Sequence, residues 1–212
     1  GFAVTLAAAG AALAAAWPGA WSFLRFQSAR GIQIESVAAT PLMVARAAGA
    51  NLAVVHRYGA EELLGPGVGA ATAACLLATV LAAVLVGVMW LRTRRRLGAG
   101  QSVSPAAAAD ATLFAVLLAM ATSRVLSPQY VVWAVAVAAV CAVLPGTSQW
   151  PVIALVLAAA ALTQLEYPFL YDRISSWPGT LVLAARNGIV IWSAVWSGIR
   201  LWRSTAIAEH VV

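Results

Sequence analysis

The residues best suited to bind or transform a ligand fall into three short polar segments of an otherwise apolar chain. The first, residues 28–36, alternates isoleucines with Gln33 and Glu35, a pattern typical of an extended segment with two unlike faces. Arg30 could bind a phosphate there, and Glu35 could accept a hydrogen bond from a sugar hydroxyl or pair with Arg30. The alternative is a solvated loop in which Arg30 and Glu35 neutralise each other.

The second segment is the turn at residues 123–130, which is too short to be a flexible loop. Its proline breaks the helix and frees nearby carbonyl groups, which need polar partners in a membrane. Arg124 is placed to hold a lipid phosphate through two hydrogen bonds, and Gln129 and Tyr130 offer further hydrogen-bonding groups. A snorkelling arginine beside an interfacial tyrosine is the competing interpretation.

The third segment, residues 164–173, carries Glu166 and an aromatic run that could cap a cavity near the lipid headgroups. Glu166 lies at the predicted end of an apolar span, where an unpaired carboxylate is costly to bury. Arg186 lies about one to two turns inside the last span, and an ionisable residue at that depth predicts a functional site with a partner. We expect Glu166 to pair with Arg124 or Arg186, and Arg186 to bind Glu166 or a phosphate. Alternatively, Arg186 snorkels to the interface.

The composition places these segments in a membrane protein. Of the 212 residues, 63% are hydrophobic and 9% are charged, against roughly 25% charged in an ordinary soluble domain. A soluble core could not hide this much apolar surface. The net charge of +6 would suit a nucleic-acid binder, but the arginines lie at the ends of apolar runs, where they act as topology signals and phosphate ligands. We therefore expect the lipid bilayer as a partner and no nucleic acid.

The apolar runs predict an all-α fold, a polytopic transmembrane bundle of about six helices. They lack the polar alternation of barrel strands. The predicted spans cover residues 2–16, 67–91, 106–123, 128–144, 151–166 and 180–201. The first is about 15 residues long, shorter than the roughly 20 that a bilayer requires, and the chain begins at Gly1. We therefore expect a single transmembrane domain, residues 1–212, that is the C-terminal fragment of a longer protein.

The arginines at 92–96 predict which ends of the spans are cytoplasmic. Alternation from there makes the C terminus cytoplasmic and places the three polar regions on the opposite face, at residues 31–66, 123–130 and 166–179. This asymmetry predicts a protein that works at one membrane surface. Six arginines then also lie on that face, so either the orientation is inverted or these arginines have a function there: Arg25, Arg30, Arg46, Arg57, Arg124 and Arg173. Thr40 followed by Pro41 predicts a short interfacial helix in the first region, with Gly49 as its stop.

No metal site and no cofactor are predicted. Cys75 and Cys141 lie inside apolar runs without partners at metal-ligand spacing, so we expect two packed thiols. His56 and His210 are far apart and have no neighbouring Cys, His or paired acids.

Five further residues are assigned to structural roles. In the last span, Ala184 with Gly188 and Ser193 with Ser197 are small residues four apart, a spacing that predicts close helix packing. Asp110, near the start of its span, is expected to complement the N-terminal dipole of that helix.

Two of the polar segments resemble motifs of a known enzyme family. The stretches Arg30-Gly-Ile-Gln-Ile-Glu-Ser and Leu126-Ser-Pro-Gln-Tyr-Val-Val-Trp resemble the C-terminal half of bacterial polytopic glycosyltransferases of family 87, mannosyltransferase-like members of the C-type membrane fold. The resemblance runs over most of the chain. It implies transfer of a mannosyl or other hexosyl group from a polyprenyl-phosphate donor to a lipid or glycan acceptor, at the extracytoplasmic face of the bacterial plasma membrane, without a metal.

The same resemblance assigns roles to the residues of both motifs. The first motif would lie by the sugar and the acceptor, through Arg30, Gln33 and Glu35. The second would approach the donor phosphate, through Arg124, Ser127, Gln129 and Tyr130. These enzymes usually place a catalytic acid in the first external loop, so the resemblance implies a catalytic base outside this chain and an inactive chain when expressed alone.

Two other classes of protein remain open. A lipid or solute transporter would also bury Arg186 and Glu166, but it would tend to show broken helices or paired repeats near the membrane midplane. A non-catalytic membrane subunit would share the topology and tolerate loss of the arginines.

Overall fold

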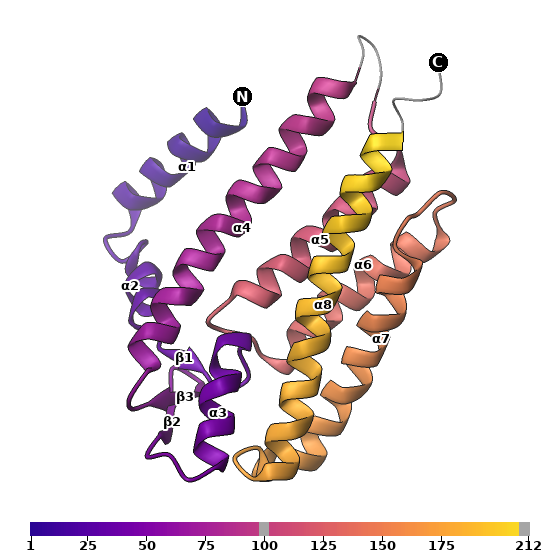
Figure 1. Cartoon of the computed structure of the whole chain (residues 1–212). Helices are drawn as coiled ribbons and strands as arrows, with labels where there is room; N and C mark the ends of the chain where they lie inside the picture. The colour runs from indigo at the N-terminus through magenta and orange to yellow at the C-terminus, as the bar shows by residue number, and fades with distance from the viewer. Residues whose placement is uncertain (98–101, 208–212) are drawn as a thin grey trace.

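The computed structural model describes residues 1–97 and 102–207, which form a helical bundle with a small sheet at one end (Figure 1). Helices hold 74% of the chain and strands 6%, so the predicted helical class is confirmed for the bulk of the fold. Among the described residues, four helices are long and apolar enough to cross a membrane, at residues 68–96, 105–122, 150–173 and 177–204. Two of the predicted spans are shorter helices, α1 (Phe2–Ala16) and α6 (Val131–Val143).

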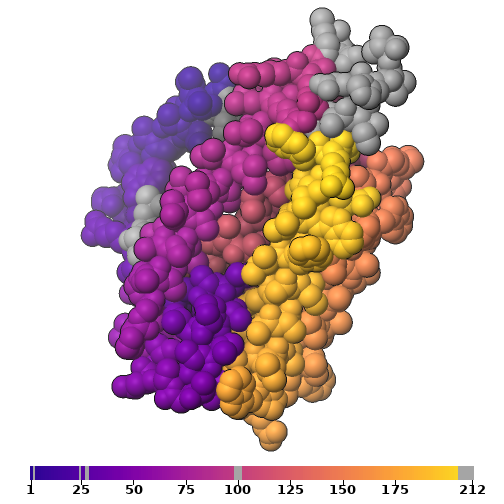
Figure 2. All heavy atoms as spheres, in the orientation of Figure 1, coloured from indigo at the N-terminus to yellow at the C-terminus, as the bar shows by residue number. Residues whose placement is uncertain are grey.

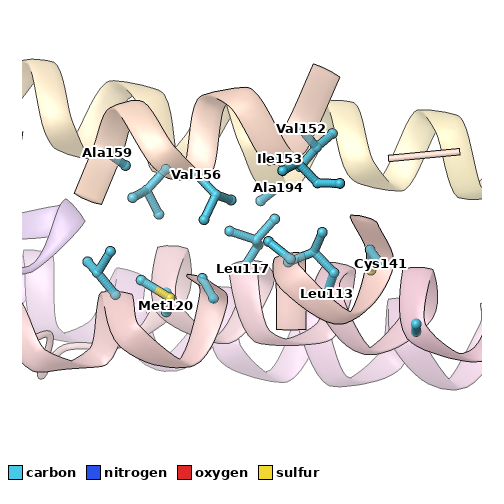
Figure 3. Close-up of a cluster of buried hydrophobic side chains, with 14 of the residues drawn as sticks. Leu113, Leu117, Met120, Cys141, Val152, Ile153, Val156, Ala159 and Ala194 are labelled. Carbon is cyan, nitrogen blue, oxygen red and sulfur yellow. The ribbon is translucent and has the colours of Figure 1, made fainter. Parts of the chain in front are cut away.

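The centre of the bundle is formed by α5 (Pro105–Thr122), α6, α7 (Trp150–Gln164) and α8 (Trp177–Ile207). Figure 3 shows Leu113 and Leu117 of α5 opposite apolar side chains of α7, with Ala194 of α8 beside them. Small buried residues such as Ala159 and Ala194 allow the helices to approach closely, which is how helices associate where lipid removes the hydrophobic driving force.

The long helix α4 (Val68–Arg96) packs against α5 and leaves much of its apolar surface exposed, as expected of a lipid-facing helix. A mainly apolar groove of about 560 Å³ separates α4 from α8 over α5, and it forms the hollow between these helices in Figure 2. Met89, Phe114 and Val195 line it.

Polar structure gathers at one end of the bundle. The sheet and α3 (Thr40–Ala47) lie at the same end as the π-helical turn η3 (Leu165–Leu170) and the 3₁₀ turn η4 (Tyr171–Arg173) (Figure 1). The C-terminal end of α4, with its arginines, and the turn between α6 and α7 lie at the other end. Two of the three polar regions therefore lie at the end opposite the arginines, and the third, residues 123–130, reaches the sheet through the backbone bond from Gln33 N to the carbonyl of Arg124.

The sheet consists of three antiparallel strands in the order β1-β3-β2. They are β1 (Ile32–Gln33), β2 (Ala53–Arg57) and β3 (Ala60–Leu64). Tyr58 and Gly59 join β2 to β3 with φ of 54° and 72°, the left-handed conformation that a two-residue hairpin turn of type I′ requires. This hairpin is not expected from the sequence pattern, because β2 does not alternate cleanly between polar and apolar residues. Its available signal is the pair Val54-Val55 followed by Tyr58-Gly59.

The predicted short helix is present as α3, which begins at Thr40 and has Pro41 in its first turn. Gly49, with φ of 99°, follows its end and donates its N–H to the carbonyl of Arg46. A 3₁₀ turn, η1 (Val37–Ala39), links β1 to α3, and the Ser36 hydroxyl accepts a hydrogen bond from Ala39 N to start it. The remaining elements are α2 (Ser22–Ala29) and the 3₁₀ turn η2 (Pro128–Tyr130).

Two structural expectations are wrong. Asp110 lies beyond the first turn of α5, where the helix dipole acts. Its carboxylate instead accepts hydrogen bonds from Thr147 Oγ1 at 2.6 Å and from Ser148 N and Oγ at 2.8 Å, and so holds the turn before α7. Gly188 is exposed, with nothing within 4 Å of a Cβ placed there, because it faces away from the neighbouring helices. Ser193 and Ser197, in contrast, are buried as expected.

Candidate functional site

A cavity of about 530 Å³ lies between the sheet, the turn before α6 and the end of α7. All three polar segments identified in the sequence contribute to its wall. The side chains with hydrogen-bonding groups that line it are Gln33, Glu35, His56, Glu61, Ser127, Gln129, Thr163, Gln164, Tyr167 and Tyr171. Residues more than 130 positions apart in the chain thus meet in one polar site.

The alternating segment around β1 is buried on both faces. Ile32 and Ile34 are 0% exposed and belong to an apolar cluster with Met43 and Leu63. Gln33 and Glu35, between them, line the cavity. The predicted extended segment is confirmed only for Ile32 and Gln33, because the hydrogen bond from Ser36 N to the carbonyl of Gln33 closes a turn over Ile34 and Glu35. A solvated loop is wrong because Glu35 is only 1% exposed.

Gln33 joins the two motifs of the sequence. Its backbone N–H donates to the carbonyl of Arg124 at 3.0 Å, and its side-chain Nε2 donates to the hydroxyl of Ser127 at 3.1 Å. The same Nε2 donates to Glu35 Oε2. Because an amide nitrogen carries two hydrogens, Gln33 can orient Ser127 and Glu35 together.

Behind the cavity, Arg186 and Glu166 form an ion pair in which neither side chain is exposed. Arg186 Nε donates to Glu166 Oε2 and Nη2 donates to Oε1, both at 3.2 Å. Of the two predicted partners of Glu166, Arg186 is the one that pairs with it in the structure. The alternative that Arg186 snorkels to the interface is wrong, because its side chain is fully buried. Its remaining nitrogen, Nη1, is buried without a hydrogen-bond partner among the described residues.

The carboxyl group of Glu35 has an unusual environment. Burial, and then the negative charge of Glu166, raise its pKa to about 7 against the opposing positive charge of Arg186. Oε2 accepts the hydrogen bond from Gln33, whereas Oε1 is buried and has no partner in the described part of the chain. Glu35 therefore presents a spare oxygen and can carry a proton near neutral pH.

Asn187 fixes the backbone that carries Glu35. Its Nδ2 lies 3.2 Å from the carbonyl oxygen of Glu35, 3.3 Å from that of Ser36 and 2.7 Å from Thr40 Oγ1, and it donates to this group of acceptors. Helix α8 thus holds the start of α3 and the end of the β1 segment in place. An exposed loop would have no such constraint.

The β2–β3 hairpin supplies two site residues that the sequence analysis did not assign. His56 and Glu61 are directly opposed in the strand register, and His56 Nδ1 lies 2.8 Å from Glu61 Oε1. Both line the cavity. The hairpin signal described above would have paired them. No cluster of three or more His, Cys, Asp or Glu that could hold a metal is found among the described residues.

Five of the nine predicted site residues lie outside the cavity wall: the buried pair of Glu166 and Arg186, and three others at or beyond its edge, Arg30, Arg124 and Tyr130. Arg30 donates to the carbonyl of Tyr58 at 3.3 Å. Arg124 is half-buried and meets β1 through its carbonyl group. Tyr130 stacks on Trp133 at a centroid distance of 4.5 Å and lines a separate, mainly apolar groove. Within the described chain, no arginine lines the cavity, whose ionisable side chains are carboxyl, phenol and imidazole groups.

Comparison of this chain with protein families, curated proteins and solved structures finds no match.

Proposed function

We propose that the chain is the C-terminal membrane portion of a glycosyltransferase that moves a hexosyl group, such as mannose, from a polyprenyl-phosphate donor to a lipid or glycan acceptor. The observation that supports it best is the hydrogen bond from Gln33 Nε2 to Ser127 Oγ. It brings the two motifs that resemble this family together in the wall of one polar cavity. The motifs are 94 residues apart in the chain, so their convergence is a property of the fold.

The chemistry of the cavity wall suits a sugar. Gln33, Gln129 and Gln164 offer amides that both donate and accept hydrogen bonds, as sugar hydroxyls require. Tyr167 and Tyr171 add aromatic surface, with their rings edge to face at 5.3 Å. A volume of about 530 Å³ lies within the usual range for small-molecule sites.

The donor phosphate has cationic partners near this site. Arg30 lies just before the β1 segment. Within that segment, Gln33 N donates a hydrogen bond to the carbonyl of Arg124. In the proposal these two arginines hold the phosphate at the rim, where their planar guanidinium groups suit two parallel hydrogen bonds. The polyprenyl chain then remains in the bilayer beside the apolar helices.

The proposal includes a topology. In it, α1 and α6 cross the membrane together with the four longer helices, and α3 lies at the interface. The arginines at 92–96 and the C terminus are cytoplasmic, as the cluster of arginines in the last turn of α4 favours. The cavity then opens at the extracytoplasmic face of a bacterial plasma membrane.

The test is sugar transfer by membranes that contain the protein expressed from its full reading frame. We expect labelled sugar to move from a polyprenyl-phosphate donor, and Arg124→Ala and Gln33→Ala to lower the rate sharply at unchanged protein level. Arg173→Ala, at an exposed arginine away from the cavity, is the matched control. Folded protein that transfers nothing from a panel of donors contradicts the proposal, and movement of the lipid-linked sugar across the bilayer without transfer would support a transporter instead.

A further inference from the structure

The charges of the cavity wall do not match a phosphate. Its acidic side chains are Glu35 and Glu61, and no arginine lines it among the residues that the structure describes. A phosphodiester in this space would meet like charges, whereas a neutral, hydroxyl-rich group would find acceptors and donors on every side. The cavity therefore fits the sugar of the acceptor better than the phosphate of the donor.

Within this wall, Glu35 has the geometry of a group that receives a proton. Gln33 holds one carboxylate oxygen, Asn187 holds the backbone, and the other oxygen, Oε1, is left without a partner among the described side chains. A buried acceptor atom normally has a hydrogen-bond partner. A hydroxyl of a bound sugar would supply the missing one.

We infer that Glu35 is the general base of the sugar transfer, taking the proton of the acceptor hydroxyl at Oε1 while the cavity holds the acceptor. This inference rests on the proposed function. It differs from the expectation, drawn from the family resemblance, that the base lies outside this chain.

The proposed step balances as a single displacement. The acceptor oxygen forms a bond to the anomeric carbon of the donor sugar, and the bond from that carbon to the phosphate oxygen breaks with its electron pair leaving on the polyprenyl phosphate. The hydroxyl proton passes to Glu35, which afterwards releases it to water. A single displacement inverts the configuration at the anomeric carbon.

The surroundings of Glu35 tune it for this role. A general base works best when its pKa lies near the operating pH, and burial raises the pKa of Glu35 to about 7. Arg186 limits the shift because its positive charge favours the ionised form. The ionisable groups that face Glu35 or share its cavity are His56, Glu61, Glu166, Tyr167, Tyr171 and Arg186.

The experiment measures kcat and KM against pH in membranes that contain the full-length protein, as wild type and with Glu35→Gln or Glu35→Asp. We expect Glu35→Gln to lower kcat by about 100- to 10,000-fold, the usual contribution of a general base, with little change in KM for the donor. Glu35→Asp should retain part of the rate. The wild-type kcat should fall below about pH 7, and this acidic limb should be absent from Glu35→Gln. Asp172→Asn, at an exposed acid outside the cavity, is the matched control.

Each other outcome overturns the inference in a recognisable way. Transfer by Glu35→Gln at close to the wild-type rate removes the base role and leaves the proposed function standing. A lower rate with the acidic limb intact assigns Glu35 a structural role only. Wild-type membranes that transfer nothing remove the proposed function and the base role together. If Glu35→Gln does not fold, the pH profile of Glu35→Asp decides, because a shorter acid should shift the limb and not abolish it.

Discussion

Arg186 and Glu166 face each other through two parallel hydrogen bonds of 3.2 Å, and both side chains are 0% exposed. The pair connects α8 to the π-helical turn that follows α7. Both charges act on Glu35: the negative charge of Glu166 raises its pKa and the positive charge of Arg186 lowers it. The pair therefore affects both the stability of this end of the bundle and the chemistry of the site.

Breaking this ion pair from one side should be strongly destabilising. Glu166→Gln or Arg186→Met each leaves a buried charge without its partner, so we expect the free energy of unfolding to fall by about 3–5 kcal/mol. The double variant removes both charges and should lose less than the sum of the two. Unfolding in detergent micelles measures all three, and additive losses would contradict the coupling.

The carboxyl of Glu35 should make stability depend on pH. Burial raises its pKa from 4.5 to about 7, so between these values the folded state binds a proton that the unfolded state has released. Stability should therefore fall as the pH rises through this window, by up to about 3 kcal/mol, and level off above it. Equilibrium unfolding across the window measures the slope. Glu35→Gln should flatten it, and an unchanged slope in that variant would assign the effect to another group.

Gly179 should tolerate no side chain, in contrast to Gly188. A Cβ at Gly179 would lie 2.4 Å from the carbonyl oxygen of Arg173 and 2.6 Å from the Cα of Ile174, and these backbone atoms cannot rotate away. We expect Gly179→Ala to lower the melting temperature markedly. Gly188→Ala, on the same helix with no atom within 4 Å, should have little effect or be slightly stabilising, since alanine favours helix. Equal melting temperatures would contradict the close approach at Gly179.

The proposed orientation predicts which positions an impermeant thiol reagent reaches. Cys75 and Cys141 are buried, so the background labelling should be low. In intact cells, Arg57→Cys on the hairpin should be labelled and Ser102→Cys at the opposite end should not, and both should react after the membrane is opened. The reverse pattern would invert the topology without changing the fold.

The sequence predicts the cavity better than it predicts the sheet beside it. Gln33 and Glu35 could be identified because alternation with Ile32 and Ile34 marks one polar and one apolar face, and this pattern is local. Glu166 and Arg186 could be paired because a buried charge in an apolar span requires a partner of opposite sign. Both arguments need only the residue types and the position of each residue within its apolar span.

Other parts depend on contacts that no local pattern encodes. The hairpin lies in a polar region whose strands are short, and its pairing with β1 depends on packing over Met43 and Leu63. Arg124 and Tyr130 have residue types that suit a ligand, but the backbone of their turn directs Tyr130 to Trp133 and away from the cavity. Side-chain direction at an irregular turn requires the three-dimensional structure.

The hydrogen bond from Asn187 to the carbonyl of Glu35 joins residues 152 positions apart, so the two partners are synthesised at different times. At about 5–20 residues per second, a ribosome needs on the order of ten seconds between making these two residues. For that interval the segment that carries Glu35 has left the ribosome while the helix that fixes it has not been made. Assembly of the site is therefore completed late during membrane insertion: a nascent chain stalled before α8 would hold every residue of the cavity wall and still lack the hydrogen bonds from Asn187 that fix the backbone of Glu35.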